Sequence, residues 1–231
     1  MISSATDAYQ YAEAKYRITK RCIEVLQQYQ IPFYVFTKSS LIERDLDLFR
    51  NYGDNCFIVW SITTIDEKIK RIIEPGTPPT TSIFDTIRKF VDSGVKCCVN
   101  IDPILPFITD RKEHLEAIVD KCQQLRLRYL SGSVLRLRHD IWTRIRHILE
   151  SLGFLWVIRE YERIYGFQEP LLHENNLSAN KIYTDKVLNN LKDAITKRNI
   201  VFGFNELMEQ ISQLAMSYPI SLKQCKISEF V

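Results

Sequence analysis

Glycine is scarce in this chain, and the scarcity limits the kinds of site that it can build. The 231 residues include only seven glycines, and no segment matches the Walker A or GxGxxG pattern. Both patterns need glycines where the backbone wraps a phosphate. The sequence therefore gives no indication of a nucleotide site of either type.

Long apolar runs are also lacking. A membrane-spanning helix needs roughly 20 consecutive apolar residues, and the sequence contains no such run. Residues 1–10 have neither a basic start nor an apolar stretch, so they do not predict a signal peptide. These absences predict a cytoplasmic protein with no membrane partner.

Cysteines are present but not at metal-binding spacings. The six are Cys22, Cys56, Cys97, Cys98, Cys122 and Cys225, and none of them forms a CxxC or CxxxCxxC pattern. Most lie in apolar surroundings, which predicts buried free thiols in a reducing cytoplasm. The sequence therefore predicts no metal ligands.

The composition otherwise suits a folded globular chain. Apolar residues make up 45% and charged residues 26%, with a formal net charge of +3. These values are close to those of ordinary domains, so we expect one large domain, or one domain with an appendage. The small net charge does not by itself indicate a nucleic-acid partner.

Strand-like and helix-like segments alternate over the first two thirds of the chain. Apolar runs predict strands at 33–37, 56–62, 95–101 and 128–135, and helical periodicity predicts helices at 9–29, 41–50, 83–91, 110–125 and 140–152. In the first helix, Ala12, Tyr16, Thr19, Ile23 and Leu26 share one face, and Thr6 or Asp7 is expected to cap it. Strands joined through helices form a parallel sheet. Four strands cannot close a barrel of eight.

The predicted fold class is therefore α/β, with parallel strands in an open sheet or a partial (β/α) barrel. Residues 2–4 look like the end of a strand whose body is missing, so the barrel is expected to be incomplete at its N-terminal side. After residue 152 the pattern becomes mainly helical, with helices at 183–197 and 206–216 and a short strand at 201–204. We predict a barrel domain at 1–152 and a helical extension at 153–231 packed on it.

Polar residues that follow the strands are the candidate site residues, because ligands bind at the carboxyl ends of parallel strands. Four of them have a stated structural alternative: Lys38 as a solvated loop lysine, Ser61 as a hydroxyl bonded to nearby backbone, and Thr6 and Asp7 as helix caps. The candidates are Ser4, Thr6, Asp7, Thr37, Lys38, Ser61, Thr63, Asn100, Asp102, Arg136 and Arg138.

Several short segments between residues 3 and 150 form an ordered set. They are Ala5-Thr6-Asp7-Ala8-Tyr9-Gln10, Thr37-Lys38-Ser39, Arg44-Asp45-Leu46-Asp47-Leu48, Trp60-Ser61-Ile62-Thr63-Thr64, Glu74-Pro75-Gly76, Asp102-Pro103-Ile104-Leu105-Pro106 and Val134-Leu135-Arg136-Leu137. Together they resemble the spore photoproduct lyase-related branch of the radical SAM superfamily. The resemblance implies a partial (β/α) barrel that binds S-adenosylmethionine (SAM) and starts here at the end of its second strand.

The same resemblance implies roles for individual residues. Lys38 would meet the carboxylate of SAM, Ser61 its ribose or amine, and Thr6 and Asp7 would also contact SAM; Thr63 joins them as a cofactor-binding candidate. Asn100, Asp102, Arg136 and Arg138 remain candidates for substrate or phosphate. Ser4 stands where spore photoproduct lyase has a cysteine that donates hydrogen, which argues against thymine-dimer repair by that mechanism.

The family also holds a [4Fe–4S] cluster on a CxxxCxxC loop, and this sequence contains no such motif. The chain is thus expected to be an enzyme fragment, a subunit whose cluster-bearing partner supplies the front of the barrel, or a domain without catalysis. A non-catalytic scaffold protein that binds nucleic acid is the alternative function. Self-association through an uncovered sheet edge is a third reading.

Basic residues gather in one stretch of the chain. Phosphates of nucleic acid are one partner for it, and a solvated helix face with salt bridges is the other interpretation. The stretch contains Arg126, Arg128, Arg136, Arg138, His139, Arg144, Arg146 and His147. His114 and His173 are expected at the surface, and Asp45 and Asp47 as surface charges or caps.

Overall fold

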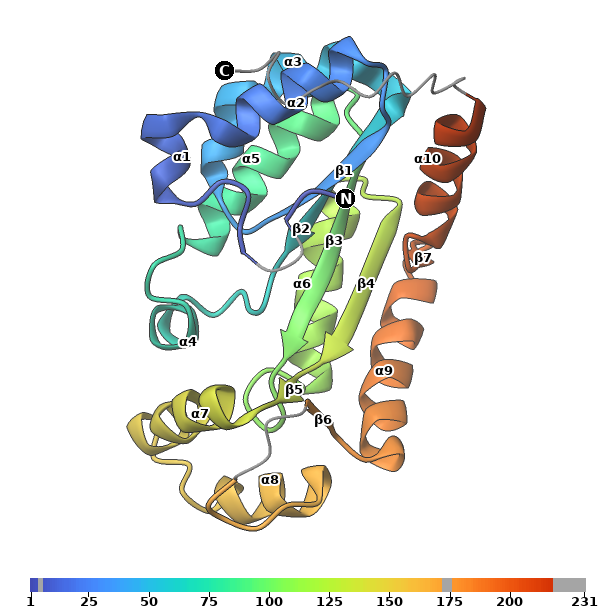
Figure 1. Cartoon of the computed structure of the whole chain (residues 1–231). Helices are drawn as coiled ribbons and strands as arrows, with labels where there is room; N and C mark the ends of the chain where they lie inside the picture. The colour runs from blue at the N-terminus through green and yellow to red at the C-terminus, as the bar shows by residue number, and fades with distance from the viewer. Residues whose placement is uncertain (4–5, 172–175, 218–231) are drawn as a thin grey trace.

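The computed structural model describes residues 1–3, 6–171 and 176–217. A parallel sheet of five strands forms its centre, in the order β1-β2-β3-β4-β7. These strands are β1 (Phe33–Thr37), β2 (Cys56–Ser61), β3 (Cys97–Ile104), β4 (Tyr129–Val134) and β7 (Val201–Phe202). The predicted α/β class and partial parallel barrel are confirmed, and the described strands do not close into a ring (Figure 1).

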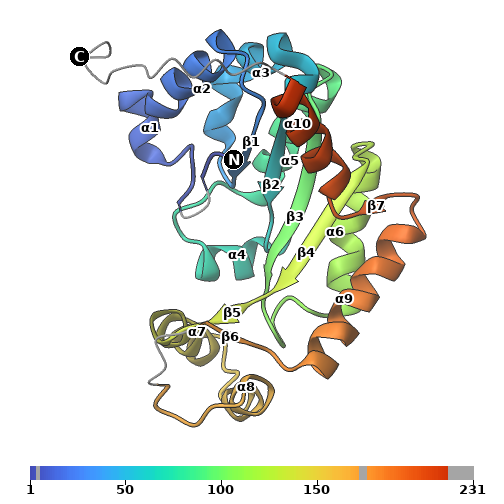
Figure 2. The ribbon, with the colours of Figure 1, turned by 45° about the vertical axis from the view of Figure 1, so that its right-hand side comes forward.

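Helices connect the strands and lie mainly along one face of the sheet (Figures 1 and 2). They are α1 (Tyr11–Tyr16), α2 (Ile18–Gln28), α3 (Leu46–Tyr52), α4 (Glu67–Ile73), α5 (Thr80–Asp92), α6 (Lys112–Gln124), α7 (His139–Ser151), α8 (Val157–Tyr165), α9 (Lys181–Thr196) and α10 (Asn205–Ser217), with 3-10 turns η1 (Ser40–Asp45) and η2 (Gly53–Asn55). None of these described helices is long and apolar enough to cross a membrane.

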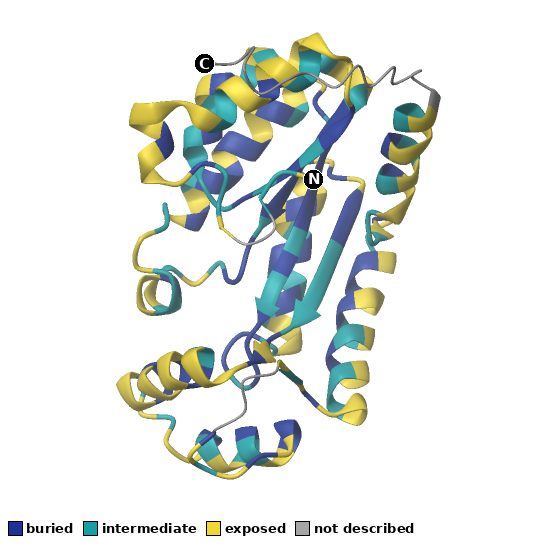
Figure 3. Ribbon diagram, in the orientation of Figure 1, coloured by how far each residue is buried: buried dark blue, intermediate teal, exposed yellow. Residues whose placement is uncertain are grey.

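The two faces of the sheet pack against different elements, because alternate residues of a strand point to opposite sides. On the outer face, Val35, Ile58 and Val99 join the main core with residues of α2, α5, α6 and α9. On the inner face, Phe57 and Cys98 pack with Leu207 and Ile211 of α10. Figure 3 shows buried residues concentrated in the strands and on the helix faces that turn toward them.

Close packing on the outer face requires Gly132, in the middle of β4. A Cβ atom at this position would lie 2.6 Å from Cδ2 of Leu191 on α9 and 3.2 Å from the carbonyl oxygen of Ile101 on β3. The absence of a side chain lets α9 approach the sheet, so α9 covers the β4 side of the barrel wall.

The first predicted helix is broken, which corrects the prediction of one helix at 9–29. The chain turns at Arg17, whose φ is 51°, and this separates α1 from α2. Glu13 causes the break, because its carboxylate accepts hydrogen bonds from the N–H groups of Thr19 and Lys20 and so caps α2. Ala12 and Tyr16 are exposed as a result, and Ile23 is the buried residue of α2.

The C-terminal extension adds to both the sheet and a second core. The strand predicted at 201–204 forms as β7, which pairs in parallel with β4. Strands β5 (Arg136–Leu137) and β6 (Leu177–Ser178) pair antiparallel, and around them α7 and α8 form a separate apolar cluster that includes Trp142 and Tyr161. The domain boundary at residue 152 stays a prediction.

Candidate functional site

Lys38 lies where three strands end. It follows β1 directly, and its Nζ atom donates to Oγ1 of Thr63 at 3.0 Å, to Oε1 of Glu74 at 2.5 Å and to the carbonyl oxygen of Asp102 at 3.1 Å. The partners come from the segment after β2, the end of α4, and β3. The position of Lys38 at the carboxyl edge of the sheet agrees with the prediction, and its three partners define the candidate site.

Glu74 is the charged centre of this arrangement. Its Oε1 also accepts from the Thr63 hydroxyl at 2.6 Å, and its Oε2 accepts from Nζ of Lys70 at 3.0 Å. Burial alone would raise the pKa of Glu74, but the ammonium groups of Lys38 and Lys70 and the hydrogen bonds outweigh it and lower the pKa to about 2. Glu74 is therefore an anion held between two cations.

Asp7 fixes the end of β1 and does not cap a helix. Its carboxylate accepts from the backbone N–H of Lys38 at 2.6 Å, from the Thr37 hydroxyl at 2.8 Å and from the N–H of Tyr9 at 2.7 Å. The cap of α1 is Gln10, so the predicted capping role of Thr6 or Asp7 is wrong. Thr6 is exposed, and Ser4 lies outside the described residues.

A row of polar residues crosses the inner face of the sheet near the same edge. Ser61 pairs in register with Asn100, and Asn100 pairs with Ser131. One step further along, the Ser133 hydroxyl donates to the Asp102 carboxylate. All five side chains are half-buried. The inner face thus changes from apolar, where α10 covers it, to polar at the carboxyl end of the strands.

An open cavity lies beside this edge. It has a volume of about 620 Å³ and is lined by Asp7, Tyr9, Lys38, Ser39 and Leu41, together with the segment 75–78. Ligand pockets of proteins typically have volumes of about 300–1,000 Å³, so this cavity has the volume of a ligand pocket. Its polar lining includes Lys38 and Asp7 and the hydroxyl residues Ser39, Ser40 and Thr77.

Two other candidate residues lie away from Lys38. Arg136 is an exposed residue of β5, and Arg138 is exposed and pairs with Asp140 at 2.8 Å. In the same basic stretch, Arg146 bonds Glu150 and Glu169, and Arg128 bonds Glu206. These ion pairs fit the interpretation of a solvated surface, and nucleic-acid binding stays a prediction.

The cysteines do not form a cluster site in the described part of the chain. Cys56, Cys97, Cys98 and Cys122 are buried and Cys22 is exposed, while Cys225 lies outside the described residues. Burial raises the pKa of the thiols of Cys56 and Cys97 to about 12, which opposes the thiolate form that iron requires. No group of three metal-ligating side chains occurs among the described residues, so this donor set does not fit a [4Fe–4S] cluster.

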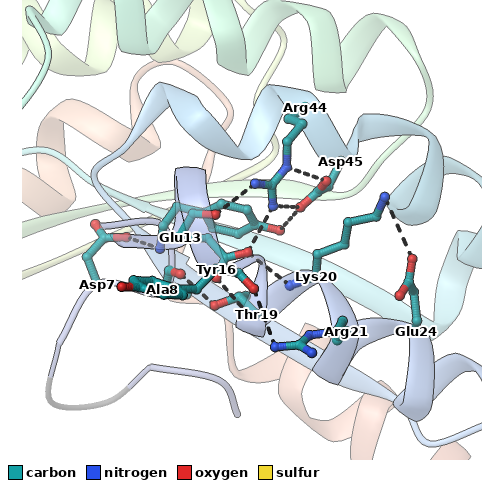
Figure 4. Close-up of polar contacts among 11 residues, drawn as sticks. Asp7, Ala8, Glu13, Tyr16, Thr19, Lys20, Arg21, Glu24, Arg44 and Asp45 are labelled. Atoms are coloured by element: carbon teal, nitrogen blue, oxygen red, sulfur yellow. Dashed lines mark hydrogen bonds and ion pairs between the residues drawn. The ribbon is translucent and has the colours of Figure 1, made fainter. Parts of the chain in front are cut away.

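Sequence reasoning missed a buried ionic network beside the cavity (Figure 4). The Arg44 guanidinium bonds both Asp45 and Glu13, and the Tyr9 hydroxyl donates to Asp45 at 3.1 Å. The Asp45 side chain has no exposed surface, so its prediction as a surface charge is wrong. Asp45 does occupy the predicted cap position, at the N-terminus of α3, but its side chain makes no capping hydrogen bond there. Asp47 is exposed and pairs with Arg50. The pKa of Tyr9 rises, first because the hydroxyl is buried and then because of Asp45.

His114 is also less exposed than the surface position predicted for it. It is half-buried, and its Nε2 has no hydrogen-bond partner among the described residues. Burial lowers the pKa of its imidazole, against the smaller opposing effects of Asp66 and Asp110. His173 lies outside the described residues.

The fold and this edge define a class of protein: a parallel (β/α) partial barrel with a ligand-sized cavity at the carboxyl ends of its strands. The family model described as "Radical SAM superfamily" matches residues 1–122. The chain belongs to the radical SAM superfamily.

Two proteins of similar sequence are both described as uncharacterized. An uncharacterized protein, ORF301, of Acidianus two-tailed virus is 32% identical over 68% of this chain and 50% of its own length. The uncharacterized protein MJ0683 of Methanocaldococcus jannaschii is 23% identical over 83% of this chain and 65% of its own. The chain thus spans about half to two thirds of the length of these relatives.

Solved structures show the same fold at low sequence identity. A spore photoproduct lyase double mutant with bound AdoMet and dinucleoside spore photoproduct matches with a TM-score of 0.66 and 14% identity, over 87% of this chain and 59% of that chain. Streptococcus suis SuiB bound to its precursor peptide SuiA matches with a TM-score of 0.55, over 86% of this chain and 36% of that chain. The predicted relation to spore photoproduct lyase is confirmed at the level of the fold.

Proposed function

We propose that this chain forms the SAM-binding side of a radical SAM barrel, with Lys38 as the residue that binds the SAM carboxylate. The observation that carries the proposal is the position of the Lys38 ammonium, at the carboxyl edge of β1 and beside a cavity of about 620 Å³. An ammonium on a flexible stem suits a carboxylate. Membership of the superfamily and the fold of an AdoMet-bound relative support the choice of ligand.

The pairing of Lys38 with Glu74 is compatible with this role. Lys70 holds the second oxygen of Glu74 at 3.0 Å and is itself almost fully buried. If Lys38 turns toward a ligand, Lys70 and the Thr63 hydroxyl still compensate the charge of Glu74. The ligand carboxylate then takes one of three contacts of the ammonium without leaving a buried anion unpaired.

Other residues supply orientation. The carboxylate of Asp7 holds the backbone N–H of Lys38, which keeps the end of β1 in place. On the inner face, Ser61 and Asn100 offer a hydroxyl and an amide for the ribose or amino group of SAM.

In the family, SAM and a reduced [4Fe–4S] cluster supply radical chemistry. The described cysteines of this chain do not fit such a cluster. The proposal therefore concerns the binding of SAM, and its reaction depends on thiolates from elsewhere.

Calorimetric titration tests the proposal with two ligands. We expect SAM to bind the wild-type chain, and Lys38→Met to weaken it by roughly tenfold or more, because a charge-assisted hydrogen bond contributes about 1.5–3 kcal/mol. Methylthioadenosine lacks the amino-acid carboxylate, so its affinity should be the same for both chains.

The matched control is Lys89→Met, since Lys89 is exposed and pairs with Glu43 at the surface. It should leave both affinities unchanged. Equal SAM affinity of the wild-type chain and Lys38→Met would reject the role of Lys38, and no binding of SAM to any variant would reject the proposed function.

A further inference from the structure

A second open cavity lies beyond the carboxyl end of β3, away from Lys38. It has a volume of about 420 Å³ and is bounded by the segment between β3 and α6, the turn between α7 and α8, and the N-terminal half of α9. These elements lie at the end of the molecule opposite to α1 and α2 (Figures 1 and 2). The two cavities share no lining residue. The volume suits a small ligand, so this cavity is a separate candidate site.

Aromatic rings form one part of the lining of this cavity. The ring centroid of Phe107 lies 6.3 Å from that of Trp156, at an interplanar angle of 66°, and 5.6 Å from that of Tyr183. The Tyr183 hydroxyl donates to the carboxylate of Asp110, which holds the ring of Tyr183 in place. Trp156 is 65% exposed. The cavity therefore offers an exposed aromatic face on which a planar ligand can stack.

Cations form the other part of the lining. Arg111, Lys112 and Lys186 are exposed, and their side chains have no hydrogen bond or ion pair among the residues that the structure describes. Asp110 and Glu113 also line the cavity, and the Asp110 carboxylate already accepts a hydrogen bond. The cations thus outnumber the anions by three to two. No side chain caps the N-terminus of α6 at this place, and the positive end of a helix dipole adds to the attraction for an anion.

The rings and the cations together indicate the class of ligand. An apolar peptide would cover the rings but would take the cations out of water without a partner, which is costly. A free phosphate ion would use the cations alone. A nucleotide uses both, because its base stacks on an aromatic ring and its phosphate pairs with lysine or arginine. The carboxylates of Asp110 and Glu113 and the amide of Asn190 are acceptors for the amino group of a base.

We propose that this cavity binds one nucleotide, with the base on the ring of Trp156 and the phosphate on Lys112 and Lys186. A free nucleotide and a nucleotide of a single strand present the same base and phosphate, so the experiment compares these two sources. The proposal uses no residue of the cavity beside Lys38. Its test is therefore independent of SAM binding.

Calorimetric titration with AMP, adenosine and inorganic phosphate tests the two halves of the site. We expect AMP to bind the wild-type chain, and adenosine and phosphate each to bind roughly tenfold more weakly or less, because each lacks one set of contacts. Trp156→Leu should weaken AMP binding by roughly tenfold, through the loss of stacking. The matched control is Leu155→Ala, since Leu155 is 59% exposed but does not line the cavity. This control should bind AMP like the wild-type chain.

Lys186→Met tests the phosphate contact. It should weaken AMP binding severalfold and leave adenosine binding unchanged, because adenosine has no phosphate. Lys197→Met is its control, since Lys197 is exposed at the opposite end of α9 and removes the same charge without lining the cavity. Lys38→Met should also leave AMP binding unchanged, which distinguishes this cavity from the one beside Lys38.

A single-stranded oligoadenylate distinguishes the sources of the nucleotide. Tighter binding of the strand than of AMP, with an affinity that falls as salt rises, would assign the cavity to a strand, and equal or weaker binding would assign it to a free nucleotide. In either case Trp156→Leu should weaken the ligand that binds. The proposal would be overturned if neither AMP nor the strand binds, if Trp156→Leu and Lys186→Met bind like the wild-type chain, or if Lys38→Met abolishes AMP binding.

Discussion

Nζ of Lys38 lies 2.5 Å from Oε1 of Glu74, although 36 residues separate them in the sequence. The contact joins the end of β1 to the residue after α4 and therefore ties the connection between β2 and α5 to the sheet. Glu74 also competes with a ligand at the proposed site, because a ligand carboxylate must draw the Lys38 ammonium away from the Glu74 carboxylate. The Lys38–Glu74 pair thus links the stability of the carboxyl edge of the sheet to the affinity of that edge for ligands.

The Glu74 carboxylate makes stability depend on acid. Its pKa is about 2 in the folded chain against an ordinary 4.5. Its contribution is therefore fully present above about pH 4.5 and is lost as the pH falls toward 2. Glu74→Gln should be less stable than the wild-type chain at neutral pH, and the difference should shrink through this window.

Urea unfolding at a series of pH values measures this difference. Glu24→Gln is the control, since Glu24 forms an exposed pair with Lys20, and its stability should follow the wild type. A stability difference for Glu74→Gln that stays constant between pH 5 and about 2 would contradict the assigned pKa shift.

The Arg44 network gives a second prediction, about stability alone. Arg44→Met leaves the carboxylates of Asp45 and Glu13 without their cation, and both side chains are almost fully buried. Removing one partner of a buried ion pair typically costs about 3–5 kcal/mol. Arg50→Met, which breaks an exposed pair with Asp47, should cost less than about 1 kcal/mol. Similar unfolding midpoints for the two variants would show that the network contributes little.

Thiol reactivity distinguishes the cysteines. Cys22 is exposed, whereas Cys56, Cys97, Cys98 and Cys122 are buried with raised pKa values. In a chain with Cys225→Ser, one thiol should react rapidly with a maleimide in the folded state and the other four only after unfolding. Adding Cys22→Ser should remove the rapid phase. Mass spectrometry of the labelled chain counts the groups, and rapid labelling of a second thiol would contradict the burial.

The elements with strong patterns were predictable from the sequence. Strand β2 reads as a continuous apolar run because both of its faces are buried, and Lys38 could be placed because a residue after such a strand lies at the sheet edge. The break at Arg17 could not be predicted from the sequence, since the helical spacing of the residues on one face continues from Tyr16 to Ile23. The interruption depends on the carboxylate of Glu13, which caps α2 only in the folded chain.

The candidate site was predictable in part for the same physical reason. The position of a residue along its strand predicted that Lys38, Ser61 and Asn100 lie at this edge of the sheet. The partners of Lys38, in contrast, arise from tertiary contacts. Glu74 had a local signal, four residues after Lys70 on one helix face, yet its contact with Lys38 depends on the path of the chain after α4. At β3, Lys38 meets the backbone carbonyl of Asp102, which the side-chain pattern does not reveal.

The approach of α9 to the sheet at Gly132 leads to the last prediction. Gly132→Ala places a Cβ atom 2.6 Å from Cδ2 of Leu191 and 3.2 Å from the Ile101 carbonyl oxygen. Overpacking of this kind typically costs about 1–3 kcal/mol. Leu191→Ala alone leaves a cavity in the core and should cost about 2–5 kcal/mol.

Since Leu191 contributes the nearest atom, the double variant Gly132→Ala with Leu191→Ala should be more stable than the sum of the two losses predicts. The 3.2 Å contact between the added Cβ atom and the Ile101 carbonyl oxygen remains, so the recovery of stability in the double variant should be partial. Gly76→Ala is the control, because nothing lies within 4 Å of its added Cβ, and it should change stability by less than about 0.5 kcal/mol. Urea unfolding of these variants and the wild-type chain measures the coupling, and strictly additive losses would show that α9 does not press on β4 at this residue.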